Sequence, residues 1–356
     1  MSAVAATSKA PTRSITSLSG RRLPRWANPA ALAAAVLAGV GVARLLGGHV
    51  VAMSVLALLF YVVGYPLLSL AVEGRRKATD RLVTTGVTAA FAVTMVPLVS
   101  VLWIVVEHGA ARFDRHFFTY SMRNVVGAGG GAYHAVLGTL EITALAAVLS
   151  VPIGLLTAVY LVEYGRGALA RALTFLVDVM TGIPSIVAGL FVYALFVLIA
   201  GPATQNAVMG SVALAVLMIP IVVRSAESMF RLVPMDLREA AYALGVPKWR
   251  TIVKVVFPTA AAGVATGVTL AIARVIGETA PLLVTVGITA TTNRDLFHGA
   301  MATLSTFTYF SFTQPGFPTQ PGIDRAWTSA LTLILIVLAL NALARVVSRY
   351  FSPKAT

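Results

Sequence analysis

The sequence predicts an all-α integral membrane protein, and three observations support this prediction. The mean hydropathy is +0.87. Only 11% of the residues are charged, whereas soluble domains carry about 25% charged residues. The apolar runs are continuous and rich in Ala, Leu and Val, without the alternation of a membrane-spanning strand. Helices are therefore expected rather than an outer-membrane barrel.

Eight apolar runs are long enough to cross a bilayer, for which a helix needs roughly 20 residues. They lie at 29–46, 50–72, 82–106, 138–162, 173–200, 208–229, 260–287 and 326–347. The first two runs meet at Gly47-Gly48, which suits a tight turn, so residues 27–73 are predicted to form a helical hairpin. Residues 1–26, rich in Ser, Thr and Ala, are predicted to form a disordered cytoplasmic tail.

The formal net charge of +14 is explained by membrane topology, so no nucleic-acid partner is expected. The basic residues alternate with the spans: 20 of the 27 fall on the side that holds both termini, and five fall in the loops of the opposite side. Cytoplasmic loops carry the excess of Lys and Arg. Both termini are therefore predicted to be cytoplasmic.

Several chemistries are excluded by what the sequence lacks. There are no cysteines, and the five histidines show no ligand spacing on a shared helix face, so no metal site is expected. "GAGGGA" at 127–132 loosely matches a dinucleotide-binding pattern, but it follows "RNVV" in a loop and is interpreted as a flexible loop. Because the chain has no G-x-x-x-x-G-K-[ST] motif, it is not expected to hydrolyse nucleotide through a P-loop of its own.

The cytoplasmic stretch "PMDLREAAYALGVPKWRTIVKVVFP", residues 234–258, predicts two helices joined by a sharp corner. Asp236 and Glu239 have the spacing of a capping box at the start of the first helix. Gly245 supplies the left-handed conformation that ends this helix, and Pro247 begins the next. The second helix, 248–256, is expected to lie at the membrane surface with one apolar face made of Trp249, Ile252, Val253 and Val256.

The spacing of this stretch resembles the EAA loop of ABC-importer permeases. Glu239-Ala240-Ala241 is followed after three residues by Gly245 and after nine more by Val255-Val256-Phe257-Pro258, with Val255 and Phe257 where Ile and Leu are usual. The resemblance implies that residues 230–258 form the coupling loop that docks into a separate ATPase subunit. The implied coupling residues are Glu239, Ala240, Ala241, Gly245, Pro247 and Pro258. An ordinary amphipathic loop is the alternative.

Three further segments resemble the phosphate-specific transport permeases of the PstA type: "LAIARVIGETAPLL", "GIPSIVAGLF" and "AWTSALTLILIVLALNALAR". The likeness covers roughly residues 82–350. It implies a type I ABC-importer permease bundle of six core helices. The N-terminal hairpin at 27–73 and the tail are then additions to that bundle.

Arg274 and Glu278 lie four residues apart in the apolar run at 260–287. Arg274 follows Pro258 by sixteen residues, roughly 24 Å along a helix, which places it well inside the membrane. An ionisable group there costs at least ~2.5 to 3.5 kcal/mol and marks a functional candidate. Glu278 is expected to pair with it across one helical turn. The guanidinium fork also matches phosphate oxygens, so a substrate contact and a structural ion pair are both open.

Other residues of this region complete the expected substrate pathway. Thr279 and Thr285 offer hydroxyl donors, and Pro281 is expected to break the helix and free backbone groups. Arg274, Glu278 and Thr279 are the predicted pathway residues. Glu141 and Asp178 are expected near helix ends, where water solvates them.

Together these features predict a transport subunit, not an enzyme, in the bacterial cytoplasmic (inner) membrane. The resemblance implies four partners: a PstC-like permease sibling, an ATPase dimer, an extracytoplasmic phosphate-binding protein and inorganic phosphate. No cofactor is expected on this chain, and ATP-Mg is expected in the ATPase. The alternatives are a permease for sulfate, molybdate or another oxyanion, and an ATP-independent channel or secondary carrier.

Overall fold

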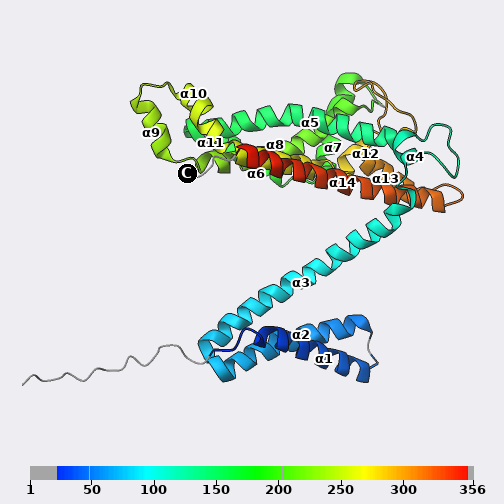
Figure 1. Ribbon diagram of the computed structural model, residues 1–356. Coiled ribbons are helices and arrows are strands. Elements are labelled where there is room, and N and C mark those ends of the chain that lie inside the picture. The colour runs from blue at the N-terminus through cyan, green and yellow to red at the C-terminus, as the bar shows by residue number, and fades with distance from the viewer. Residues whose placement is uncertain (1–21, 48, 203, 352–356) are drawn as a thin grey trace, which may run out of the picture. The chain divides into compact units, whose positions relative to one another are not determined.

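The computed structural model describes residues 22–47, 49–202 and 204–351. Throughout that part of the chain the regular elements are helices (Figure 1), which confirms the all-α prediction. Seven helices are long and apolar enough to cross a membrane, or up to eight if a bent pair counts as one span. The chain divides into two compact units, Met1–Leu102 and Trp103–Thr356. The predicted domain limits, at residues 26, 73 and 82, stay a prediction.

The first unit contains the predicted hairpin, α1 (Ala27–Leu45) and α2 (Val50–Glu73). Gly39 of α1 lies directly against the backbone of Ala57 in α2, where any side chain at position 39 would collide. Small residues permit this close approach of two membrane helices. In the predicted turn, Gly47 has φ +66°, and Gly48 lies outside the described residues. Most of the predicted tail, residues 1–21, also lies outside them.

The next helix, α3 (Arg75–Gly109), begins earlier than the sequence suggested. A single residue, Gly74 with φ +89°, separates it from α2. The basic residues at 75–81 therefore lie in the first turns of a helix and not in a loop before residue 82. Arg, Lys and Ala are good helix formers, so α3 extends toward its N-terminus as far as Gly74, whose positive φ separates it from α2.

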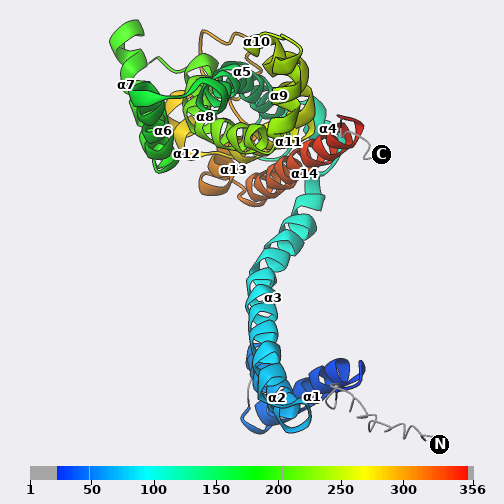
Figure 2. The ribbon, with the colours of Figure 1, turned by 90° about the vertical axis from the view of Figure 1, so that its left-hand side faces the viewer.

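The core of the second unit forms around α8 (Ala207–Arg231), which lies beside α5 (Tyr133–Val159) and α11 (Phe257–Val275) in both views (Figures 1 and 2). Side chains from all three helices meet in one buried apolar cluster. The fully buried members include Ile142 and Ala146 from α5, Leu214, Met218 and Val222 from α8, and Ala271 and Val275 from α11.

The predicted single helix at 173–200 is wrong, because the structure breaks it into α6 (Gly167–Thr181) and α7 (Ser185–Ala200), bent by 110°, although the pair together counts as one candidate span. Pro184 has ψ 136°, outside the helical region, and no N–H to donate. Proline also disfavours helical geometry in the residue before it. The continuous apolar composition of 173–200 concealed this break.

The predicted span at 260–287 is also wrong at both ends. Helix begins at Lys248, continues through α10 (Lys248–Thr251) and the π-helical turn η3 (Ile252–Val256) into α11, and stops at Val275. The predicted surface helix at 248–256 is thus the start of a long helix. A new helix, α12 (Ala280–Thr285), begins with Pro281 in its first turn, so the break precedes this proline.

Shorter elements and one long helix complete the second unit. They are η1 (Ala110–Arg112), α4 (Arg115–Thr119), η2 (Tyr160–Tyr164), α9 (Met235–Ala243), α13 (Leu304–Thr313) and α14 (Gln320–Phe351). Side-chain caps fix several starts: Asp114 accepts from the N–H of Phe117, and Asn206 accepts from that of Met209. Such caps satisfy first-turn N–H groups that have no partner within the helix.

Candidate functional site

A cavity of about 700 Å³ lies where the α6–α7 bend faces α8 and the end of α11. Its lining is mostly apolar, with a few polar and charged side chains from the bend and from the break after α11. The lining residues are Met180, Thr181, Ile183, Pro184, Ser185, Leu217, Pro220, Ile221, Leu270, Arg274 and Glu278. The helix break before α7 and the helix break after α11 therefore border the same cavity.

Arg274 lies in the last turn of α11 and is exposed to this cavity. Within the described part of the chain its guanidinium has no hydrogen-bond or ion-pair partner. The expected pair with Glu278 does not form there, because α11 ends at Val275 and Glu278 is no longer one helical turn away. The structure therefore contradicts the predicted ion pair, although both side chains line the cavity.

The start of α7 adds a second feature that favours negative charge. This 16-residue helix begins at Ser185, which lies on the cavity wall. The first N–H groups of a helix have no partner within it, and the helix dipole is positive at this end. An anion in the cavity would therefore have Arg274 on one side and a helix N-terminus on another.

The two predicted hydroxyl donors do not line the cavity. Thr279 precedes α12 and is not among the lining residues. Thr285 is fully buried, and its hydroxyl donates to the carbonyl of Pro281 at 2.8 Å. The assignment of Arg274, Glu278 and Thr279 to a substrate pathway stays a prediction.

The predicted elbow at residues 230–258 has the expected corner but not the expected cap. Gly245 has φ +72°, the left-handed conformation, between α9 and α10. The expected capping box of Asp236 and Glu239 is wrong: Pro234 occupies the N-cap position, and no side chain caps α9. Because α9 begins at Met235, directly after Pro234, Asp236 already lies within the first turn.

The exposed face of the elbow also differs from the prediction. Trp249 and Val253 are each 58% exposed, whereas Ile252 and Val256 are buried. The four side chains expected on one apolar face therefore divide between an exposed and a buried face. The reason is that the π-helical turn η3 changes the angular spacing between successive residues. The coupling residues Glu239, Ala240, Gly245 and Pro247 are exposed, and Ala241 is buried.

Sequence reasoning missed the buried ion pair that holds this elbow. Arg238 of α9 and Glu163 of η2 lie 3.0 Å apart, with side chains only 7% and 6% exposed. The same guanidinium donates to the carbonyls of Val233 and Phe230 at 2.6 and 2.8 Å. Lys248 donates to the carbonyl of Glu163. The residues of the pair are far apart in the sequence, and no local pattern links them.

A second charged cluster joins α6 to α8. The carboxylate of Glu227, largely buried, accepts from Arg224 and from Arg231, each at 2.8 Å. Arg224 also pairs with Asp178 near the end of α6, which agrees with the expected position of Asp178. Glu141 differs from expectation, because it lies in the third turn of α5 with one buried carboxylate oxygen that has no partner among the described residues.

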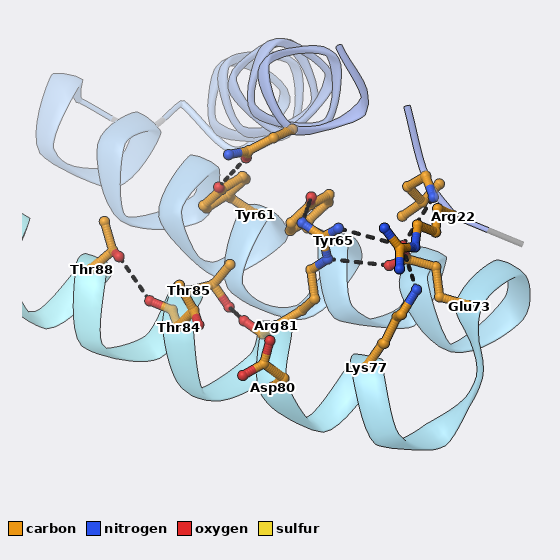
Figure 3. Close-up of a pocket in the computed structure, with 12 residues that line it drawn as sticks. Arg22, Tyr61, Tyr65, Glu73, Lys77, Asp80, Arg81, Thr84, Thr85 and Thr88 are labelled. Carbon is orange, nitrogen blue, oxygen red and sulfur yellow. Dashed lines mark hydrogen bonds and ion pairs between the residues drawn. The ribbon is translucent and has the colours of Figure 1, made fainter. Parts of the chain in front are cut away.

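The first unit has its own polar pocket of about 490 Å³ (Figure 3). At its centre, the carboxylate of Glu73 accepts from the N–H of Leu23 and the hydroxyl of Ser69, at 2.9 and 2.8 Å. Arg81 of α3 donates to the same carboxylate at 3.2 Å and to the hydroxyl of Tyr65. This network fixes the chain before α1 against the end of α2, so the pocket has a structural explanation.

Comparisons with known proteins give consistent results. The family model "Binding-protein-dependent transport system inner membrane component" matches residues 150–356. The phosphate transport system permease protein PstA 1 of Mycobacterium tuberculosis (strain CDC 1551 / Oshkosh) is 48% identical over 276 residues, 77% of this chain and 90% of the relative. PstA of Yersinia pestis is 40% identical over 251 residues, 70% of this chain and 83% of the relative.

Solved structures show the same fold at low sequence identity. A chain from the crystal structure of a bacterial alginate ABC transporter, in complex with alginate pentasaccharide-bound periplasmic protein, is 13% identical. The TM-score is 0.58, and the match covers 78% of this chain and 97% of that chain. The fold is therefore that of an ABC-importer permease, as the sequence resemblance implied. The chain belongs to the family of binding-protein-dependent transport system inner membrane components.

Proposed function

We propose that this chain is the membrane permease subunit of an ATP-driven importer of inorganic phosphate. The observation that carries the proposal is Arg274, a guanidinium without a protein partner in the described part of the chain, on the wall of a cavity. A partner-free arginine at membrane depth is costly, and a passing oxyanion supplies the missing charge. The N-terminus of α7 favours the same charge. Relatives named as phosphate transport permeases agree with this substrate.

The elbow at residues 230–258 is the proposed coupling element. Its surface carries large exposed apolar side chains, with Leu244 83% and Trp249 58% exposed. Exposed apolar patches mark contact surfaces for a protein partner. A separate ATPase dimer would bind here and hold ATP-Mg, while this chain binds no cofactor. Closure of that dimer would move α9, and the buried pair of Arg238 and Glu163 would pass the motion to the end of α5.

The chain is a multi-pass inner-membrane protein of this family. In the proposal both termini are cytoplasmic, because most basic residues lie in the segments on that side. The permease would pair with a PstC-like sibling and receive phosphate from an extracytoplasmic binding protein. It is a transport subunit and not an enzyme, in agreement with its relatives, which are named as transport permease proteins.

Uptake by the reconstituted complex tests the substrate and the need for ATP. Proteoliposomes holding the permease pair, the ATPase and the binding protein should accumulate phosphate only with ATP, and sulfate poorly. Preferential uptake of sulfate or molybdate would favour another oxyanion. Uptake without the ATPase would favour a channel or secondary carrier and refute the coupling role of the elbow.

Variants of the cavity test the role of Arg274. Arg274→Ala should assemble but lose at least about tenfold in uptake, because a charge-assisted hydrogen bond contributes about 1.5 to 3 kcal/mol. Arg274→Lys keeps the charge without the planar fork and should be impaired. Glu278→Gln should assemble normally, since no ion pair is broken. Arg171→Ala, an exposed arginine on α6, is the matched control. Normal phosphate uptake by assembled Arg274→Ala would contradict the site.

A further inference from the structure

A second cavity, of about 340 Å³, lies between the start of α5, α13 and α14. It shares no lining residue with the cavity of Arg274. Its polar lining residues are His134, Thr289, Ser311, Gln314 and Arg325. One water occupies about 30 Å³ of liquid, so the space admits a small ion together with several waters.

Arg325 of α14 is the charged group of this cavity and is only 5% exposed. One guanidinium nitrogen, Nη1, donates to the carbonyls of Gly127 and Gly129 at 2.8 and 3.1 Å. Its Nε is buried without a partner, and no carboxylate pairs with Arg325 in the part of the chain described. The adjacent Asp324 accepts from Gln320 instead. A buried charge without a counter-ion is costly, which points to a missing negative ligand.

His134, the second residue of α5, faces the same cavity and is 3% exposed. Both ring nitrogens lack a hydrogen-bond partner among the described residues, and the ring packs edge-on against Phe307. Ser311 and the side-chain amide of Gln314 are also without partners there. Each of these three polar side chains, like Arg325, can donate a hydrogen bond, and no carboxylate of the described chain lines the cavity. The charge of Arg325 disfavours a cation, whereas an oxyanion offers acceptors on several sides.

We propose that Arg325 and His134, with Ser311 and Gln314, form a second site that binds a small tetrahedral oxyanion such as phosphate. The loops at 120–132 and 288–303, which border it, belong to the side predicted to be extracytoplasmic. The site thus binds the anion apart from the pathway cavity, on the side from which an imported anion arrives. Binding there does not depend on whether the chain transports phosphate.

Equilibrium dialysis with radiolabelled orthophosphate tests this site on the purified full chain in lipid nanodiscs. The reference protein carries Arg274→Ala, which removes the pathway arginine. It should still bind phosphate, and adding Arg325→Gln should weaken this binding at least tenfold. Arg325→Lys should lose less, because it keeps the charge. Sulfate should compete with phosphate, and chloride should not, because only an oxyanion matches the donors.

Arg112→Gln, on the same reference, is the matched control. Arg112 donates to the carbonyls of Gly129 and Gly130 at 3.5 and 3.0 Å, so it holds the same glycine loop without lining the cavity. It should bind phosphate like the reference. Equal loss in Arg112→Gln and Arg325→Gln would reduce both arginines to a structural role and overturn the proposal.

Two further results bear on the proposal. If Arg325→Gln does not fold, Ser311→Ala takes its place and should weaken binding roughly threefold, as expected for one neutral hydrogen bond. Unchanged binding by a folded Arg325→Gln or Ser311→Ala protein would overturn the site, as would the absence of phosphate binding by the reference. Loss of uptake in Arg274→Ala concerns only the proposed transport function, so the two conclusions fail separately.

Discussion

Replacing Arg238 with Met should detach the coupling elbow from the bundle while the bundle stays inserted. The substitution keeps the apolar stem but removes the guanidinium that pairs with Glu163 at 3.0 Å. The same guanidinium donates to the carbonyl of Phe230 at the end of α8 and to that of Val233 just before α9. The Glu163 side chain, 6% exposed, then remains buried without its counter-charge. Breaking a buried pair on one side costs about 3 to 5 kcal/mol.

Hydrogen exchange of peptides covering residues 235–251 measures this cost. Each 1.4 kcal/mol is a factor of ten, so exchange at the elbow should accelerate by roughly 100-fold or more. Arg231→Met is the matched control, because Arg231 pairs with Glu227 at 2.8 Å but is 64% exposed. An exposed pair contributes about 0.2 to 1 kcal/mol, so its exchange should change by about fivefold at most.

The double variant Arg238→Met with Glu163→Met should recover much of the protection. Replacing both members of a buried pair by apolar side chains leaves no charge unpaired and is often neutral. ATPase retention by the purified complex should follow the same order. Elbow exchange in Arg238→Met within fivefold of the parent chain, or a double variant worse than the single one, would refute the reasoning.

Three further predictions concern other parts of the chain. Gly245→Val should insert normally but lose ATPase-dependent uptake, because φ +72° is unfavourable for a β-branched residue; normal uptake would contradict the coupling assignment. Deletion of residues 1–72 removes two candidate spans and should preserve topology and transport, checked by protease protection and uptake; total loss of uptake with normal insertion would place the hairpin in the mechanism. Asp114→Ala should lower the free energy of unfolding by about 1 kcal/mol at pH 7, which thermal unfolding of the purified protein measures. The hydrogen bond from the N–H of Phe117 holds the pKa of Asp114 below its usual value, so this difference should disappear as the pH falls through that lowered pKa. A pH-independent difference would contradict the cap.

Much of the architecture could be predicted from local sequence. Composition and run length gave the all-α membrane class and the positions of most spans, since a helix in lipid must be both apolar and long. The corner at Gly245 could be predicted, because the left-handed residue that ends a helix is most often glycine and this preference depends only on the local backbone. The family resemblance rested on contiguous motifs and identified the permease fold.

The helix breaks at Pro184 and after Val275 were not predicted correctly. Lipid alone would favour continuous helices through both apolar runs, because it cannot satisfy free backbone groups. The breaks are stable where neighbouring helices cover them and where they border a cavity. That environment depends on how α6, α7, α8 and α11 pack, which hydropathy does not contain.

The sequence by itself determined what is local: the membrane class, the hairpin, the elbow corner and the presence of an arginine deep in an apolar run. Only the tertiary structure decided which charges meet. It separated Arg274 from Glu278 by ending α11 at Val275. It also joined Arg238 to Glu163 and placed His134 and Arg325 on the wall of one cavity. Burial and pairing depend on distances between distant segments, and these are fixed only when the helices pack.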